Sequence, residues 1–242
     1  MSLLIFIQEG LNEAVASARI VAPVEMNILD LAFKGGWIMI PIVLLFFIAA
    51  GIFVERLLVI RKASKESDSF MDRIKDYILG SRIDSAKNLC KKTDTPYARM
   101  IEKGINRLGR PMNDIQVAIE NVGVIEVAKL EKGFTWVATT AAIAPMLGFF
   151  GTVTGMVRAF FDMANAGSSV DITLLSGGIY EALVTTVAGL AAGIPALFAY
   201  NYLVARVDGV IAKMEARTMD FMDILNEPVT EQQSWQSEEK EK

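Results

Sequence analysis

Hydroxyl and carboxyl side chains lie inside two strongly apolar stretches of the chain, where they could bind or transfer protons. The stretch APMLGFFGTVTGMVRAF contains Thr152, and the stretch EALVTTVAGLAAGIPALFAYN begins with Glu181 and contains Thr185 and Thr186. A hydroxyl donates or accepts a hydrogen bond without changing its charge, whereas a carboxyl group can carry a proton. Ionisable groups at membrane depth are functional candidates. The helix dipole also favours a glutamate near a helix N-terminus, so Glu181 fits a simple capping role as well.

The composition excludes several kinds of enzyme site. The 242 residues contain no histidine, so a histidine metal cage, a histidine proton relay and a Ser-His or Cys-His nucleophile are all excluded. The single cysteine, Cys90, excludes an internal disulfide, and we interpret it as a small buried apolar residue. The string GFFGTVTG resembles a phosphate loop only superficially, because no strand precedes it and no lysine follows it. We expect no enzyme activity and no cofactor.

Three long windows contain no Asp, Glu, Lys or Arg: Gly35–Val54, Gly133–Val157 and Ala182–Ala205. At 1.5 Å rise per residue, even the shortest window reaches about 30 Å as a helix, which is the thickness of the hydrocarbon core of a bilayer. The chain is 52% hydrophobic, and its charged residues lie outside these windows. The sequence therefore predicts an all-α integral membrane protein with three transmembrane helices.

The basic residues predict the orientation of these spans. Segment 61–132, between spans one and two, is rich in Lys and Arg, whereas segment 1–34 carries only Arg19 and Lys34. The connection between spans two and three carries only Arg158. By the positive-inside rule, the N-terminus and that connection are periplasmic, whereas the large loop and the C-terminus are cytoplasmic.

These assignments divide the chain into eight segments. They are a periplasmic amphipathic N-terminal segment (1–34), transmembrane helix 1 (35–60), a cytoplasmic helical domain (61–132), transmembrane helix 2 (133–160), a periplasmic connection (161–178), transmembrane helix 3 (179–205), a cytoplasmic helix (206–228) and a disordered tail (229–242). We expect transmembrane helices 2 and 3 to extend without a break into the cytoplasmic domain.

Local signals place further features in the cytoplasmic part. Thr95 and Pro96 predict a capped helix start, because proline is favoured at the first helical position. From Met112 onward, one stripe of residues at helical spacing is expected to lead into span two. It is formed by Ile115, Ala118, Ile119, Val122, Ile125 and Lys129. Glu55 and Arg56, at the inner edge of span one, predict an ion pair at a protein-facing position.

Small residues and prolines in spans two and three predict close helix packing. Small side chains let helix backbones approach each other, which drives association in lipid through van der Waals contact. A proline frees a backbone carbonyl, which favours a polar or protein-lined neighbour. The packing candidates are Pro145, Gly148, Gly151, Gly155, Gly189, Gly193 and Pro195. Thr152 shares a helix face with Gly148 and Gly155, so no bulky side chain covers its hydroxyl.

The three spans offer no titratable proton carrier near mid-membrane, because Glu181 lies at the outer edge of span three. A protein that moved protons by itself would need such a carrier. The polar faces of small residues therefore predict the lining of a pore whose carrier is supplied by another chain.

The strings APMLGFFGTVTGM and EALVTTVAGLAAGIPALFAYN resemble the second and third spans of the MotA/TolQ/ExbB proton-channel family. The family motifs read LGLLGTVxG and EALxxTAxGLxxAIPAxxxYN, and this chain departs from them at Val187, where the family commonly has alanine. The layout over residues 36–226 looks like ExbB, with TolQ next, rather than the four-span flagellar subunit.

The resemblance implies a homopentameric ring in the inner membrane of Gram-negative bacteria. A single-span ExbD-like or TolR-like partner would occupy the pore and carry the proton on its aspartate, and a TonB-like or TolA-like protein would transmit the work. By motif position the pore hydroxyls are Thr152 and Thr186, with Glu181 as the family's glutamate. Helical spacing alone would place Thr185 nearer the face of Glu181, so Thr185 stays a second choice.

The expected function is an ExbB-like motor subunit that couples the proton-motive force to TonB-dependent transport across the outer membrane. A TolQ-like subunit of the envelope-maintenance system is the alternative. A secondary transporter for small solutes is disfavoured, because the chain has no inverted repeat and no ion-binding carboxylate at the membrane midplane. A purely structural scaffold is a third possibility.

Overall fold

The computed structural model describes residues 35–65, 69–165 and 172–226, and these residues form helices and short turns. The amphipathic segment predicted at 1–34 and the tail predicted at 229–242 lie outside the described residues. The helices are α3 (Met39–Ala63), α4 (Phe70–Leu79), α5 (Ile83–Thr93), α6 (Pro96–Ile105), α7 (Met112–Leu130), α8 (Phe134–Asn165) and α9 (Ile172–Asn226). The all-α fold class is confirmed.

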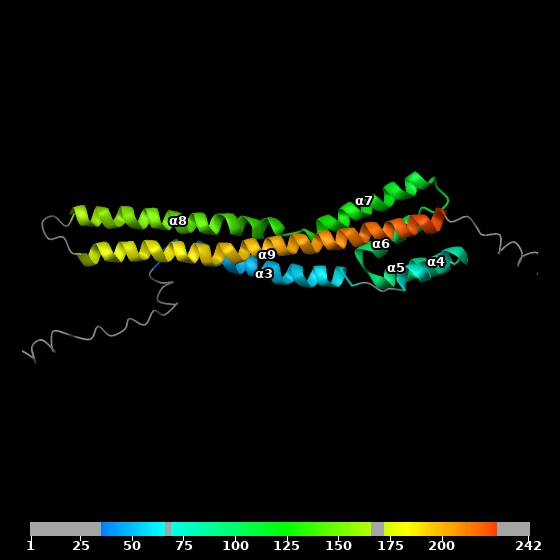
Figure 1. Cartoon of the computed structure of the whole chain (residues 1–242), viewed down its shortest axis with the longest axis horizontal. Helices are drawn as coiled ribbons and strands as arrows, with labels where there is room; N and C mark the ends of the chain where they lie inside the picture. Colours follow the sequence, from blue (N-terminus) through cyan, green and yellow to red (C-terminus); the bar gives the residue numbers. More distant parts are fainter. Residues whose placement is uncertain (1–34, 66–68, 166–171, 227–242) are drawn as a thin grey trace, which may run out of the picture.

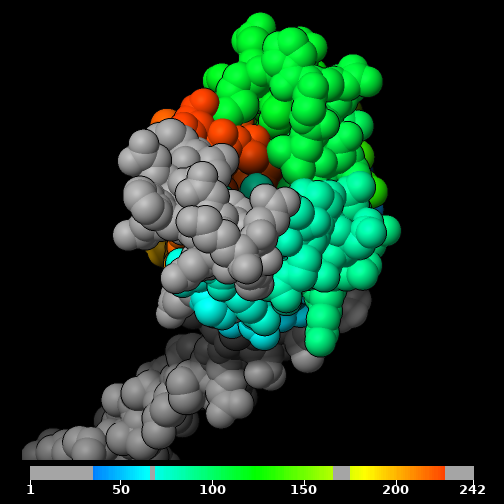
Figure 2. All heavy atoms as spheres, turned by 90° about the vertical axis from the view of Figure 1, so that its right-hand side faces the viewer, coloured from blue at the N-terminus to red at the C-terminus, as the bar shows by residue number. Residues whose placement is uncertain are grey.

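The described helices form a long rod in which α9 runs from one end to the other (Figure 1). Helix α8 lies along one side of the first half of α9, and α3 lies along another side (Figure 1). Helices α4 to α7 gather at the other end of the rod, beside the second half of α9. Of these helices, α4, α6 and α7 contact α9, whereas α5 packs against α4 and α6. The term four-helix domain is used for α4, α5, α6 and α7 together with the second half of α9. Figure 2 shows this end of the molecule, with α7 in green, α4 and α5 in teal and the end of α9 in orange.

Three helices are long and apolar enough to cross a membrane: α3, α8 and Leu175–Asn226 of α9. The prediction of three helices able to span a membrane is therefore confirmed. Large apolar side chains such as Phe47 on α3 and Phe149 on α8 are two-thirds exposed in the single chain. Such exposure is stable only where lipid or another protein chain covers these side chains, because water would penalise it.

The expectation of one continuous helix from Met112 into span two is wrong. Helix α7 ends at Leu130, and α8 begins at Phe134 after a turn that contains Gly133. Gly133 has φ +88°, a left-handed conformation that side chains disfavour and glycine adopts readily. Only α9 runs unbroken from the membrane into the four-helix domain. The connection predicted at 161–178 is also shorter, since α8 continues to Asn165 and α9 begins at Ile172.

The apolar stripe predicted on α7 is correct only in its first half. Ile115, Ala118 and Ile119 are buried, but Ile125 is exposed. After Ile119 the buried positions are Gly123, Glu126 and Leu130. The buried face therefore turns away from the predicted one, because the end of α7 contacts α3 as well as α9.

Large side chains hold the four-helix domain together. Its fully buried members include Phe70, Ile74, Ile101, Ile119 and Phe221. The ring of Phe70 meets that of Tyr97 edge-on, with 5.2 Å between the ring centroids. Pro96 occupies the first turn of α6 as expected, but the predicted Thr95 cap does not form, since the hydroxyl has no hydrogen-bond partner among the described residues.

Candidate functional site

Glycines bring the backbones of α8 and α9 into direct contact in the membrane section. A β-carbon placed on Gly189 of α9 would lie 2.5 Å from the carbonyl oxygen of Ala144, and one on Gly148 of α8 would lie 2.9 Å from the carbonyl oxygen of Thr185. Real side chains do not tolerate such distances to backbone atoms. The two positions therefore need glycine because of the partner helix, which is the packing mode of small residues in membranes.

The other predicted packing residues lie along the same contact, with one exception. Gly151 packs against Thr185, Gly155 against Ala182, and Gly193 against the ring of Pro145. Pro195, by contrast, is exposed on the surface of α9. The carbonyl that Pro195 leaves without its helical donor is therefore not part of the α8–α9 contact.

Thr152 and Thr186 are hydrogen-bonded to each other across the α8–α9 contact, and both are half-buried. The Thr186 hydroxyl also lies 3.1 Å from the carbonyl oxygen of Gly148. The Thr152 hydroxyl lies 3.2 Å from the carbonyl oxygen of Ala182 and 3.3 Å from that of Gly148. A hydroxyl has one proton and two lone pairs, so the protons of both threonines can be used inside the pair while acceptor capacity is left over.

Thr185 is enclosed inside the chain. Its side chain is only 1% exposed, and its hydroxyl donates to the carbonyl oxygen of Ala182 at 2.7 Å. It also packs against Gly151. Of the two adjacent threonines, Thr186 therefore lies beside Thr152 at the half-exposed surface, whereas Thr185 fills the helix contact.

Glu181 belongs to α9, but its side chain lies away from the hydroxyl pair and beside the turn that precedes α3. One carboxylate oxygen of Glu181 occupies the space that a side chain on Gly36 would need, and Gly36 has φ +67°. Five residues separate Glu181 from Thr186, or about 7.5 Å along the helix axis. The structure therefore brings together Thr152 and Thr186 and places Glu181 against the turn before α3.

Glu55 and Arg56 form an ion pair at the lower part of α3, with 2.6 Å between Arg56 Nη2 and Glu55 Oε1. The Arg56 side chain is only 11% exposed, and its other terminal nitrogen donates to the carbonyl oxygen of Lys129 at 3.1 Å. That carbonyl belongs to the last turn of α7, where backbone acceptors lack helical donors. Arg56 thus ties α3 to the end of α7.

A buried carboxylate on α7, outside the membrane spans, was missed in the sequence. The side chain of Glu126 is 4% exposed and pairs with Arg99 at 2.5 Å and with Lys129 at 2.7 Å. Arg99 also pairs with Asp94 at 2.6 Å. The buried positions at this end of α7 follow helical spacing: Ile119, Gly123, Glu126 and Leu130. A charged residue at one position of an otherwise uncharged helix face was the sequence signal for this buried carboxylate.

The charge network shifts the pKa values of its members. Burial alone would raise the pKa of Glu126, but hydrogen bonds from Arg99 and Lys129 outweigh burial and lower it. Burial alone would lower the pKa of Arg99, but Glu126 and Asp94 outweigh burial and raise it. Both side chains therefore stay charged at neutral pH, which suits a structural clamp between α6 and α7 rather than a proton carrier.

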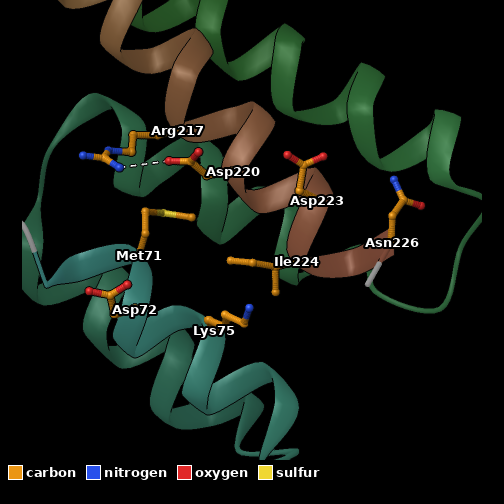
Figure 3. Close-up of a pocket in the computed structure, with 8 residues that line it drawn as sticks. All are labelled: Met71, Asp72, Lys75, Arg217, Asp220, Asp223, Ile224 and Asn226. Carbon is orange, nitrogen blue, oxygen red and sulfur yellow. Dashed lines mark hydrogen bonds and ion pairs between the residues drawn. The ribbon is translucent and has the colours of Figure 1, made fainter. Parts of the chain in front are cut away.

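The four-helix domain contains two hollows. One is a cavity of about 610 Å³ between α4 and α9. Figure 3 shows the side chains that line it, among them Asp72, Asp220 and Asp223 together with Lys75 and Arg217. A groove of about 930 Å³ lies between α7 and α9 and is lined by several methionines. Among the described residues, no group of three His, Cys, Asp or Glu side chains is placed to hold a metal ion.

Comparison with known proteins identifies similar chains. Residues 92–216 match the model of the MotA/TolQ/ExbB proton channel family. The Tol-Pal system protein TolQ of Haemophilus influenzae is 30% identical over 77% of this chain and 88% of the relative. A putative biopolymer transport protein ExbB-like 1 of Synechocystis sp. is 31% identical over 74% of this chain and 71% of the relative. A putative ExbB homolog of Methanothermobacter thermautotrophicus is 32% identical over 50% of this chain, which spans only 42% of that relative.

Proposed function

Because this chain belongs to the MotA/TolQ/ExbB proton channel family, we propose that it is an ExbB-like motor subunit of the inner membrane. In this proposal, five copies form a ring around a single-span ExbD-like partner. The ring couples the proton-motive force to a TonB-like protein and so to transport across the outer membrane. The N-terminus is periplasmic and the four-helix domain is cytoplasmic.

The observation that carries the proposal is the Thr152–Thr186 pair. Its two hydroxyls come from different helices, lie at a half-exposed surface and remain neutral at every physiological pH. Helix α8 contains no Asp, Glu, Lys or Arg from Phe134 to Val157. A proton that passes this level must therefore be carried by a group from outside the chain, and the aspartate of the partner fits that role.

Neutral hydroxyls suit a carrier that changes its charge. A protonated carboxyl of the partner would donate its hydrogen to a threonine oxygen, and the ionised form would accept hydrogen from a threonine hydroxyl. Rotation of a hydroxyl about its C–O bond is enough to switch between these two states. A lysine or arginine at this place would hold the carboxylate in an ion pair and lower its pKa, which would oppose proton uptake.

Exposed apolar surfaces support assembly into a ring. In the membrane section, Phe149 and Phe198 on α8 and α9 are largely exposed in the single chain. Outside the membrane section, the methionine-lined groove between α7 and α9 is open. Neighbouring subunits would cover both surfaces, because exposed patches of this kind mark sites of protein or membrane contact.

A TolQ-like role is the second candidate, since TolQ relatives match as well as ExbB relatives do. The two roles differ in the chains that bind the ring. Co-expression with ExbD-like and TolR-like proteins distinguishes them, because the native ring retains the partner that fits its pore through purification.

Thr152→Val is the test of the proposed channel. Removing one hydrogen bond to an ionised group costs about 1.5–3 kcal/mol, so proton flux through the ring with its partner in liposomes should fall by roughly tenfold or more. The ring should keep its native mass, because valine has nearly the shape of threonine.

Thr154→Val is the matched control. Among the described residues, the Thr154 hydroxyl bonds only to carbonyls of its own helix, at 3.0 Å from Phe150 and 3.1 Å from Gly151. This variant should conduct like the unaltered protein. Unchanged flux in Thr152→Val, or an equal loss in both variants, would contradict the assignment of the hydroxyl pair. Uptake of a small solute by the chain alone would favour a transporter.

A further inference from the structure

A cleft between α3 and α9, at the level where span one ends, is strongly basic. It has a volume of about 390 Å³, and four cationic side chains line it: Arg61, Lys65, Arg206 and Lys213. No acidic side chain lines it among the described residues, while Glu66 and Asp68 follow Lys65 in the sequence and lie outside the described residues. A cleft with this charge attracts an anion.

The same cleft has an apolar side. Leu57 and Ile60 of α3 line it, and they precede Arg61 by four residues and by one residue. The neighbouring Val54 and Leu58 are exposed on α3, in the helix that is apolar enough to cross the membrane. The α3 side of the lining therefore changes from apolar to cationic along the membrane normal. A ligand with an acyl chain and a phosphate, in that order, matches this change.

Arg206 is held in a position that suits a headgroup phosphate. Its guanidinium lies over the ring of Tyr202, 5.0 Å from the centroid, and donates to the Tyr202 hydroxyl at 2.8 Å. Tyr202 is one helical turn nearer the membrane, so the guanidinium is directed back toward the headgroup level. The planar guanidinium has five N–H donors, and those not used by Tyr202 can bind phosphate oxygens.

Lys213 closes the opposite end of the cleft. Its ammonium lies 3.5 Å from the carbonyl oxygen of Ser64, just past the end of α3. The contact joins α9 to α3 on the side away from the membrane. The α9 side of the cleft is thus cationic at both ends, with Arg206 toward the membrane and Lys213 away from it, whereas Leu57 and Ile60 form the apolar part of the α3 side.

We propose that this cleft binds the phosphate headgroup of an anionic phospholipid in the cytoplasmic leaflet, such as phosphatidylglycerol. The inference goes beyond the proposed channel and uses its orientation only to name the leaflet. A free phosphate shares the charge of the headgroup but would leave the apolar side of the cleft unused. Each basic residue near an anionic headgroup contributes about 1 kcal/mol, so even two of them give a preference of tenfold or more over a neutral lipid.

The test is native mass spectrometry of the detergent-purified full chain, titrated with phosphatidylglycerol and with phosphatidylcholine of the same acyl chains. We expect the first bound phosphatidylglycerol to bind at least about tenfold more tightly than phosphatidylcholine. In the double variant Arg61→Gln, Arg206→Gln this preference should fall about tenfold. Inorganic phosphate at millimolar concentration should not displace the lipid.

Lys62→Gln is the matched control. Lys62 follows Arg61 in the same helix but pairs with Asp94 at 3.5 Å and does not line the cleft. An equal loss of preference in Lys62→Gln would show attraction to the overall positive surface and would overturn the site. Displacement by phosphate would overturn the lipid assignment. Since these readouts need neither partner nor proton flux, they fail independently of the proposed channel.

Discussion

The membrane contact of α8 with α9 and the core of the four-helix domain hold helices together by opposite means. In the membrane section, glycines place backbone against backbone, as at Gly148 and Gly189. In the four-helix domain, large side chains such as Phe70 and Phe221 fill the space between helices. Water drives the burial of such side chains, whereas lipid does not distinguish them from its own tails.

The comparison explains where a functional hydroxyl can lie. Between closely spaced helices, Thr152 and Thr186 reach the carbonyls of the neighbouring helix and each other. In the four-helix domain, the Thr218 hydroxyl bonds to the carbonyl oxygen of Met214 in its own helix, and the Thr95 hydroxyl has no partner among the described residues. Close packing in the membrane therefore serves stability and also supplies polar partners for the proposed proton path.

The largest expected effect in this comparison is that of Gly189→Ala. The added β-carbon meets backbone atoms of α8, at 2.5 Å from the carbonyl oxygen of Ala144, and no side-chain rotation relieves the clash. We expect a loss of about 1–3 kcal/mol or more in the free energy of unfolding, together with disruption of the hydroxyl pair. Thermal unfolding in detergent and proton flux measure the two consequences.

Gly123→Ala in the four-helix domain is the counterpart. Its β-carbon would lie 3.0 Å from the terminal methyl of Met100, which can rotate away. Alanine also favours the helix by up to about 1 kcal/mol relative to glycine. Gly123→Ala should therefore leave the melting temperature unchanged or raise it. Similar losses in both variants would contradict the distinction between backbone and side-chain contact.

A smaller effect is expected from Glu126→Gln, which weakens the clamp between α6 and α7. Removing the charge leaves Arg99 and Lys129 without their carboxylate, and because both cations are partly exposed we expect a loss of about 1 kcal/mol. Hydrogen exchange of the α6 and α7 amides measures it. Glu120→Gln on the exposed side of α7, where Glu120 accepts a hydrogen bond from Gln116, is the control and should change little.

The effect of Glu126 should also depend on pH. Because the folded protein lowers the pKa of Glu126, its contribution is fully present above the ordinary value of 4.5 and is lost as the pH falls through the lower folded value. The difference in exchange between the unaltered protein and Glu126→Gln should therefore shrink below pH 4.5. A difference that grows on acidification would contradict the ion-pair assignment.

The reactivity of the Cys90 thiol in the four-helix domain is expected to be low, and no change in stability is involved. Burial, and next the charge of Glu102, raise the pKa of the Cys90 thiol to about 12. Because the thiolate is the reactive form, alkylation at pH 8 should be over a hundredfold slower than for an exposed cysteine. Mass spectrometry should find Cys90 unmodified in the native protein and alkylated after unfolding. Rapid labelling of the native protein would show that the core opens readily.

The spans could be predicted from the sequence because a charge-free stretch long enough to cross a bilayer is a local property. Helical spacing alone could not choose Thr186 over Thr185 as the partner of Thr152, because the two adjacent threonines differ only in which side of α9 meets α8, whereas the family motif did favour Thr186. Likewise, the break at Gly133 depends on how α7 and α8 must diverge. A glycine after a basic last turn favours a helix end here, but Gly123 lies inside the same helix, so glycine alone does not predict the break.

The clamp at Glu126 shows a further reason for such misses. Burial of a charged residue is predicted poorly because it depends on partners far along the chain, here Arg99 on another helix. The neighbouring hydrophobic residues made Ile125 the better candidate for the buried face. Pairing with the cations of Arg99 and Lys129 makes Glu126 rather than Ile125 the buried residue, because a paired carboxylate can be buried at moderate cost.

The unbroken helix α9 can transmit motion along its whole length. Its 55 residues span about 80 Å at 1.5 Å per residue, so one rigid element joins the hydroxyl pair to the far end of the molecule. Pro195 lies inside it and removes one backbone hydrogen bond, which is the usual place for a helix to bend. A tilt of about 3° at Pro195 would move the far end by roughly 2–3 Å over the remaining length. A small change beside the Thr152–Thr186 pair would thereby reach the opposite end of the chain as a displacement large enough to alter side-chain contacts.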